Sequence, residues 1–282
     1  MRAEGDNAPM AEKREKDEVP DGYRRELLRD GDVDLIALPQ AWDAAKHAIE
    51  TSGTLFDYAS ARPDAQPLAG RGVAWHIAAP GSYTNERWVV RHYRRGGFVA
   101  RFTQDRYVHS TPTRPVRELN ASVRARSRGV ATPEVVAAAI YPTGGWYRAD
   151  IVTRFLPDSR DLADRLFTDD DAERRRSAMR LAGGLVRAIH EAGVVHNDLN
   201  LRNILIASGA DGERAWLLDL DRAVVMRDSA AKFERNLMLR RFARSLKKLE
   251  KENRTRLRDG EREVFADAYA TGTRAPVPAA GA

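Results

Sequence analysis

The stretch that most constrains this chain runs from His196 to Asn203, reads His-Asn-Asp-Leu-Asn-Leu-Arg-Asn, and continues into the apolar run Ile204–Ile206. A second acidic stretch, centred on Asp219, follows another apolar run shortly downstream. Asp198, Asn203 and Asp219 together offer oxygen ligands for a hard cation and a carboxylate that can accept a proton. Asp and Asn also punctuate turns, so each stretch taken alone has a purely structural interpretation. Both stretches, in this order and at this spacing, favour catalysis.

The same pattern is typical of phosphoryl transfer on a protein-kinase-like fold. There an Asp accepts the proton of a substrate hydroxyl, an Asn five residues later holds a metal ion, and a later Asp chelates Mg²⁺ between the β- and γ-phosphates of ATP. We therefore predict Asp198 as the catalytic base, Asn203 and Asp219 as metal ligands, and ATP and Mg²⁺ as cofactors. His196 is predicted to orient the loop rather than to act as an acid or base.

Composition limits the class of protein and its partners. The chain has 282 residues, no cysteine, and 47 basic against 41 acidic residues, most of the basic ones being Arg. The absence of cysteine excludes disulfides and thiolate metal sites and fits a cytoplasmic protein. The basic excess suits an anionic partner, namely nucleic acid, a membrane surface or an acidic substrate. No apolar run approaches the length of a membrane span and the N-terminus has no apolar signal core, so we expect any membrane association to be peripheral.

The expected organisation is an α+β, protein-kinase-like bilobal fold with a β-rich small lobe and a short, mainly α-helical large lobe. Residues 1–21 are polar and predicted to be a disordered tail. Residues 22–156 are assigned to the N-terminal lobe and 157–271 to the C-terminal catalytic lobe, with a second tail at 272–282. Within the first lobe, Ala41–Ile49 is predicted as a short helix.

The nucleotide half of the site is predicted in the N-terminal lobe. A glycine-rich tip with Gly70 and Gly72 begins a hairpin whose other strand, Arg87–Tyr93, carries Arg91 at the position where kinases have Lys. Such glycines are also common in ordinary hairpin turns. Glu118, on a helix predicted over Arg114–Arg126, either pairs with Arg91 or is simply exposed.

Two more strands complete the predicted small lobe, Val135–Ile140 and Ala149–Pro157. The second ends where a kinase hinge meets adenine with its backbone groups, and Thr153 is a candidate cofactor contact there.

A basic loop between Arg91 and Arg106 carries five Arg and one Asp, with aromatic residues between them. Dense charge of this kind is either a solvated loop or an anion-binding element, and its place near the expected cleft makes acceptor recognition a serious alternative. The candidate acceptor-binding residues are Arg94, Arg95, Arg101 and Arg106.

The large lobe is predicted to be helical over Asp161–Phe167 and Asp171–Ala192, and Gly193 stops the second helix. The segment Lys232–Arg258 has eleven basic and three acidic residues around an apolar stripe. It is expected to pack that stripe on the lobe, which is compatible with contact to anionic lipid head groups. Nothing downstream of Asp221 matches a protein-kinase activation segment.

Several motifs together closely resemble the lipopolysaccharide kinase family of the kinase-like superfamily, in particular its 3-deoxy-D-manno-octulosonic acid (Kdo) kinases. They are the run Arg91-His-Tyr-Arg-Arg-Gly-Gly97, its continuation Asp105-Arg-Tyr107, the loop at His196 and the Leu-Leu-Asp-x-Asp stretch ending at Asp221. The resemblance covers roughly Gly70 to Tyr269.

The resemblance implies ATP-dependent phosphorylation of the 4-hydroxyl of Kdo on a lipid A precursor, at the cytoplasmic face of the inner membrane. It gives Asp198 the catalytic position and Asn203 and Asp219 the metal positions. It also gives the basic loop a reason, because Kdo carries a carboxylate and lipid A carries phosphates. The implied partners are the Kdo-bearing lipid A precursor and an anionic inner-membrane surface, with no nucleic acid expected.

Alternative functions remain open from the sequence. Within enzymes these are a heptose kinase of the lipopolysaccharide core and a kinase-like phosphotransferase acting on an antibiotic or a protein. From another class, a non-catalytic kinase-like protein would use its basic face for binding. Nucleic-acid binding would show a steep salt dependence and no Mg·ATP turnover.

Overall fold

The computed structural model describes residues 18–68, 74–81, 86–93, 106–108, 112–209 and 212–272. The chain separates into two compact units, one formed by the residues up to Asn120 with Glu134–Phe155, the other by Ala121–Pro133 and the residues from Leu156 onwards. The first contains an antiparallel sheet and the second is mainly helical. The predicted α+β class with a β-rich and a mainly helical part is confirmed. Of the two predicted tails, only residues 18–21 and Gly272 are among the described residues.

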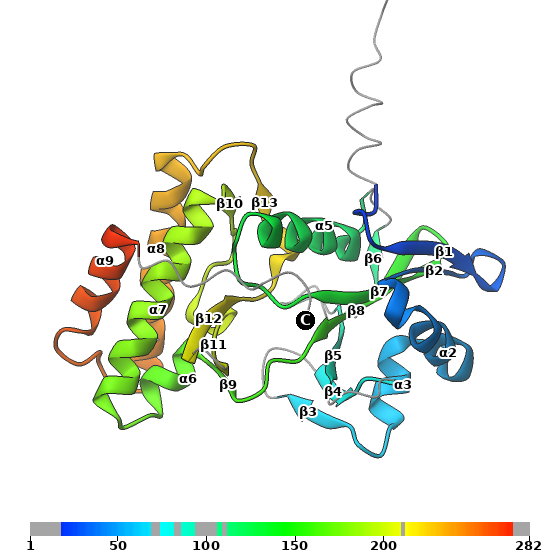
Figure 1. Ribbon diagram of the computed structural model, residues 1–282, viewed down its shortest axis with the longest axis horizontal. Coiled ribbons are helices and arrows are strands. Elements are labelled where there is room, and N and C mark those ends of the chain that lie inside the picture. Colours follow the sequence, from blue (N-terminus) through cyan, green and yellow to red (C-terminus); the bar gives the residue numbers. More distant parts are fainter. Residues whose placement is uncertain are drawn as a thin grey trace, which may run out of the picture. The chain divides into compact units, whose positions relative to one another are not determined.

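The sheet of the first unit has the strand order β1-β2-β7-β8-β5-β4-β3, and β6 pairs with β8 (Figure 1). Every pairing is antiparallel. The strands are β1 (Arg24–Leu28), β2 (Val33–Ala37), β3 (Gln66–Leu68), β4 (Ala74–Ala78), β5 (Arg87–His92), β6 (Tyr107–Val108), β7 (Val135–Thr143) and β8 (Trp146–Arg154). The predicted strands at 87–93, 135–140 and 149–157 are confirmed as β5, β7 and β8.

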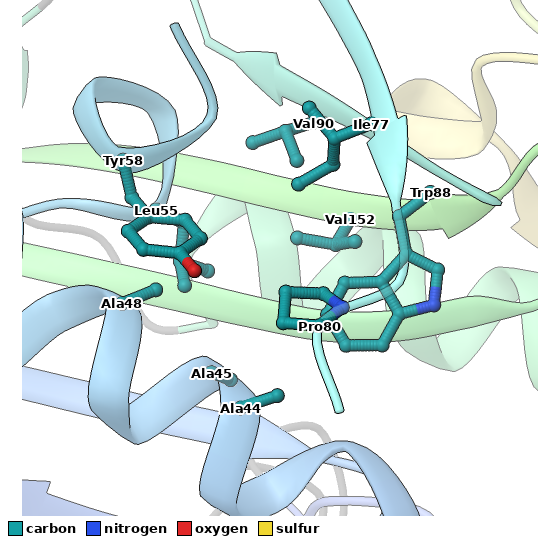
Figure 2. Close-up of a pocket in the computed structure, with 10 residues that line it drawn as sticks. All are labelled: Ala44, Ala45, Ala48, Leu55, Tyr58, Ile77, Pro80, Trp88, Val90 and Val152. Atoms are coloured by element: carbon teal, nitrogen blue, oxygen red, sulfur yellow. The ribbon is translucent and has the colours of Figure 1, made fainter. Parts of the chain in front are cut away.

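Two helices, α2 (Trp42–Ser52) and α3 (Leu55–Ala61), pack on one face of this sheet. Side chains alternate along a strand, so Trp88 and Val90 of β5 point to this face and are buried. Small residues of α2, among them Ala45 and Ala48, border a small apolar pocket with Trp88 (Figure 2). The predicted helix at 41–49 is confirmed as α2.

Helix α5 (Arg114–Ser127) confirms the helix predicted over 114–126. Its first turns carry Glu118, which meets Arg91 of β5. Because Arg91 alternates with Trp88 and Val90, this contact lies on the sheet face opposite α2 and α3. The predicted hairpin with Arg87–Tyr93 as its second strand is confirmed in its described residues, since β4 and β5 pair from Ala74 with Arg91 to Ala78 with Arg87.

Besides the second half of α5, the second unit contains four α-helices and two small sheets among its described residues. The helices are α6 (Leu162–Phe167), α7 (Ala172–Glu191), α8 (Lys232–Glu252) and α9 (Glu261–Thr271). The strands are β9 (Ser159–Asp161), β10 (Val194–Val195), β11 (Ile204–Gly209), β12 (Gly212–Leu217) and β13 (Val224–Val225). Within the described part of the chain, no helix is both long and apolar enough to cross a bilayer.

Helix α8 buries the apolar stripe that the sequence pattern indicates. Met238, Phe242, Leu246 and Leu249 recur every three or four residues and are at most 7% exposed. They join one hydrophobic cluster with α6, α7 and the β11–β12 hairpin. Packing of this helix on its lobe is therefore confirmed.

The segment 121–133 differs from expectation, because the predicted N-terminal lobe contains all of residues 22–156. Its apolar residues Ala121, Ala125 and Val130 belong to the hydrophobic cluster of the second unit. The Leu217 amide also donates to the Ala131 carbonyl at 2.8 Å. The second half of α5 and the following turn therefore belong with the helical unit, an outcome that depends on contacts distant in sequence.

Candidate active site

Asn203 and Asp219 are brought together by the β11–β12 hairpin of the second unit. The two strands turn at Gly209 and Gly212, and their open end pairs Ile204 with Leu217. Asn203 immediately precedes the first strand and Leu218 immediately follows the second, so the two lie side by side. The Leu218 amide donates to the Asn203 carbonyl at 2.9 Å.

Asp198 is held beside this hairpin by hydrogen bonds to its backbone carbonyl. The side-chain amides of Asn200 and Asn203 each donate to the Asp198 carbonyl at 2.9 Å. The Asn200 side chain also accepts from the Arg202 amide at 3.0 Å, which starts the short helical turn Leu201–Asn203. Asn200 was given no function from the sequence, although an Asn that immediately precedes a helical turn often accepts from the amide two residues on.

His196 ties the loop to the strand that precedes Asp219. It is 1% exposed, its Nε2 lies 3.0 Å from the Leu218 carbonyl, and its Nδ1 accepts from the Asp198 amide at 3.2 Å. An Nδ1 that accepts a hydrogen bond requires the neutral ring with its proton on Nε2. Burial lowers the His196 pKa, which keeps the ring in that form. This geometry suits the predicted orienting role.

Asp219 has an unusual backbone for a residue with a side chain. Its φ is 61° and its ψ is 64°, in the left-handed region, immediately before the helical turn Leu220–Arg222. A non-glycine residue held there carries about 1–3 kcal/mol of strain, and such strain clusters at functional sites. Asp tolerates this conformation better than most residues, which fits a carboxylate set in one direction.

The donor set suits a magnesium ion bound together with phosphate. Among the described residues no three His, Cys, Asp or Glu side chains form a metal cluster. Mg²⁺ in phosphotransferases usually takes only one or two protein oxygens and completes its coordination with substrate phosphates and water. One carboxylate and one amide oxygen, from Asp219 and Asn203, are such a set. The hydrogen bonds between their segments bring Asp198, Asn203 and Asp219 close together, and their assigned roles stay predictions.

Arg91 and Glu118 form an ion pair in the first unit. The Arg91 Nη2 lies 2.6 Å from Glu118 Oε1, and the hydroxyl of Tyr93 donates to Oε2. The Glu118 side chain is only 6% exposed, whereas that of Arg91 is 32% exposed. Burial and the Glu118 charge raise the Tyr93 pKa well above its usual value, so its hydroxyl stays protonated and donates. The structure thus selects the paired alternative for Glu118 over the exposed one.

Aromatic rings surround this ion pair and hold a second cation. The Arg114 guanidinium lies 5.3 Å from the Tyr93 ring centre and 4.7 Å from that of Tyr107. The Arg114 amide also donates a hydrogen bond to the Tyr147 hydroxyl, at 3.0 Å. Arg114 and Tyr147 were not predicted as site residues, because Tyr107 comes to lie beside Tyr147 through the pairing of β6 with β8.

A buried carboxylate, Asp150, organises the opposite face of the same strands. It is fully buried and accepts hydrogen bonds from His92 at 2.6 Å, Tyr141 at 2.8 Å and the Phe56 amide at 3.0 Å. It thereby fixes the start of α3 against β5 and β8. The sequence offers Asp150 as one more polar residue in a strand, and nothing local identifies this contact.

The remaining predicted site residues are placed as follows. Thr153 lies inside β8, in register with Val89 on one side and Val135 on the other. Arg106 is exposed just before β6. Five others lie outside the described residues: Gly70, Gly72, Arg94, Arg95 and Arg101.

Comparison with known proteins gives consistent matches over most of the chain. Residues 66–269 match the model of the "Lipopolysaccharide kinase (Kdo/WaaP) family". A curated protein of Stenotrophomonas maltophilia K279a, 3-deoxy-D-manno-octulosonic acid kinase, is 34% identical over 229 residues, 80% of each chain. The protein of that name from Xanthomonas euvesicatoria pv. vesicatoria is 33% identical over 236 residues, 83% of this chain and 82% of its own.

Among solved structures, the chain is similar to WaaP in complex with acyl carrier protein. The match has a TM-score of 0.49 and 21% sequence identity, and it covers 81% of this chain and 87% of that one.

Proposed function

The chain belongs to the lipopolysaccharide kinase (Kdo/WaaP) family, and on that basis we propose that it is a 3-deoxy-D-manno-octulosonic acid kinase. The reaction is ATP-dependent phosphorylation of the 4-hydroxyl of the Kdo residue of Kdo-lipid IVA, a step of lipopolysaccharide inner-core biosynthesis. The observation that carries the proposal is that Asp198, Asn203 and Asp219 lie together at the open end of the β11–β12 hairpin. They do so in a chain that matches this family over residues 66–269.

Asp198 is the proposed general base. Its carboxylate takes the proton of the attacking 4-hydroxyl while the new O–P bond forms to the γ-phosphorus and the bond to the β-phosphate oxygen breaks, so that ADP leaves. Two side-chain amides and the His196 ring fix the loop around Asp198, as their hydrogen bonds indicate. Positioning of this kind supplies most of the rate in phosphoryl transfer, because the protein itself has little covalent chemistry to perform.

Asn203 and Asp219 are the proposed ligands of Mg²⁺. When bound, the metal neutralises charge on the phosphates of ATP. In the other unit, Arg91 is proposed to contact the α- and β-phosphates in place of the usual Lys, with Glu118 fixing its guanidinium. Gly70 and Gly72 would cover the phosphates, and Thr153 is the proposed contact near the adenine.

The acceptor explains the basic loop. Kdo carries a carboxylate and the lipid A portion carries phosphates, both of which Arg recognises with paired hydrogen bonds. The proposed acceptor-binding residues are Arg94, Arg95, Arg101 and Arg106. Since the acceptor is a lipid, we place the protein at the cytoplasmic face of the inner membrane, bound peripherally to an anionic surface and not to nucleic acid.

Substitution of the base tests the proposal directly. We expect Asp198→Ala to lower the turnover number by roughly 10²–10⁴-fold, the usual contribution of a general base, and to leave ATP affinity nearly unchanged. Transfer of labelled γ-phosphate and ATP binding by calorimetry would be measured on the same preparations. The matched control is Asp228→Ala, an exposed carboxylate of the same unit that should have no effect. Turnover near wild type in Asp198→Ala would refute the assignment.

A further inference from the structure

Helix α8 packs directly against the catalytic loop through its inner face. The His196 amide donates to the Met238 sulfur at 3.2 Å, and the Leu201 amide donates to the Ser245 hydroxyl at 3.4 Å. A helix with its side chains is roughly 10 Å across. The outer face of α8 is therefore about one helix diameter from the loop that carries Asp198.

The outer face of α8 carries a stripe of one aromatic residue and four cations. At 100° per residue, positions i, i+7, i+11, i+14 and i+18 lie on one side of a helix, opposite the buried stripe that begins at Met238. All five stripe residues are exposed, and Phe233 is 69% exposed. We call them the outer stripe: Phe233, Arg240, Arg244, Lys247 and Lys251.

The charge of the outer stripe is not balanced by neighbouring carboxylates. The whole helix has eight basic residues against three acidic ones. Glu252 pairs with Lys248, and Glu250 pairs with Arg262 of α9. In the part of the chain that the structure describes, none of the four outer-stripe cations forms an ion pair.

We propose that the outer stripe docks α8 along an anionic lipid surface, with Phe233 entering the interface between head groups and acyl chains. The apolar face of α8 is buried in the core, so its membrane contact would come from the outer stripe, where Lys and Arg are attracted to anionic lipid and the exposed Phe233 ring supplies the apolar contact. A row of cations alone would serve any polyanion, and Phe233 is the feature that favours lipid. This inference extends the proposed function, since a lipid-linked acceptor requires that the catalytic loop be held beside the bilayer.

The test measures docking without ATP or acceptor. The full-length protein is floated with vesicles of phosphatidylcholine alone and of phosphatidylcholine mixed with phosphatidylglycerol. We expect binding to the anionic vesicles only, weakened by salt. Removing two charges with Arg244→Gln and Lys247→Gln should lower the partition coefficient about 25-fold, since each basic residue near such a surface is worth about fivefold. Phe233→Ser should lower it by at least about fivefold.

The matched control is Leu27→Ser, which removes an exposed apolar side chain of the first unit, 65% exposed, and should bind as wild type does. Unchanged thermal unfolding of each variant would show that folding is intact. Equal vesicle binding by the wild type and both stripe variants would overturn the proposal. So would binding to duplex oligonucleotide without binding to anionic vesicles, because the stripe would then be a nucleic-acid surface.

A parallel kinase assay separates this inference from the proposed function. With a water-soluble, acyl-free Kdo acceptor, the stripe variants should phosphorylate at the wild-type rate. With a vesicle-embedded acceptor, their rate should fall by the same factor as their partition coefficient. Failure of the wild type on both acceptors would refute the proposed function, whereas the flotation result would still decide the docking surface.

Discussion

The Glu118 carboxylate binds two residues of the Arg91–Gly97 motif. One oxygen pairs with Arg91 and the other accepts the hydroxyl of Tyr93, and the side chain is almost completely buried. An Arg side chain is flexible, so a buried partner that fixes its fork reduces the freedom it would lose on binding phosphate. Glu118 is thus expected to affect ATP binding through Arg91 as well as stability.

Glu118→Gln should raise the KM for ATP about tenfold and lower the free energy of unfolding by about 2 kcal/mol, the usual worth of a charge-assisted hydrogen bond. Tyr93→Phe is the matched variant, because it removes one donor and leaves the ion pair intact. It should lower stability by about 1 kcal/mol with little change in KM. If Glu118→Gln lost stability while KM for ATP stayed at the wild-type value, the ion pair would be structural only.

For individual residues, the sequence identifies the chemical groups of the site better than it identifies the contacts those residues make. Asp198, Asn203 and Asp219 are recognisable because metal binding and proton transfer require these residue types at this spacing. The contribution of Asn200 and the left-handed backbone of Asp219 were not predicted, since both depend on the local path of the chain. Tyr93 and Arg114 meet because both are hydrogen-bonded to β8, Tyr93 through the Ala149 carbonyl and Arg114 through the Tyr147 hydroxyl, contacts between residues far apart in sequence.

Among elements, the contact of α7 with α9 is close enough to require glycine. A Cβ on Gly183 would lie 2.4 Å from the Phe265 carbonyl, so the two helices could not approach as they do with any larger residue. His190, two turns beyond Gly183 in α7, meets Tyr269, one turn beyond Phe265 in α9. Its Nδ1 and the Tyr269 hydroxyl are 2.8 Å apart. His190 is 2% exposed.

Burial, with a contribution from Arg235, lowers the pKa of His190 to about 4. The unfolded chain, with a His pKa of about 6.5, then binds more protons than the folded chain at intermediate pH, so stability falls as pH falls through that window. Between pH 7 and pH 5, this residue should contribute a loss of about 2 kcal/mol in the free energy of unfolding.

Urea unfolding of the wild type and His190→Gln at both pH values measures this contribution. The variant should lose about 2 kcal/mol less than the wild type over that interval, whereas His47→Gln, at an exposed histidine, should behave as the wild type does. An identical pH dependence in wild type and His190→Gln would contradict the role of burial at this position.

The predicted helix at 171–192 exists as α7 with a shift of one residue at each end, whereas α8 begins at Lys232 as predicted but ends at Glu252, six residues before Arg258. Strands β1 and β2, helix α3 and the three-residue strands β3 and β9 were not predicted. Short edge elements have little periodicity of their own, and their formation depends on the neighbours with which they pair.

For the whole molecule, two lobes were predicted because the motifs follow a kinase-like order and the strand predicted at Ala149–Pro157 ends where a kinase hinge would lie. The sequence did not predict that residues 121–133 belong with the helical unit, since this follows from the packing of Ala125 and Val130 among residues distant in sequence. Arg91 and Glu118 belong to the first unit, and Asp198, Asn203 and Asp219 belong to the second.

Transfer of phosphate from ATP to Kdo can be tested directly in one assay. The protein, Mg²⁺ and ATP labelled in its γ-phosphate would be offered Kdo-bearing lipid A precursor, the same precursor without Kdo, and a protein substrate in parallel. We expect label on the Kdo-bearing lipid only, and loss of that label when Mg²⁺ is chelated. Label on the precursor without Kdo, on the protein substrate, or on none of the three would contradict this expectation.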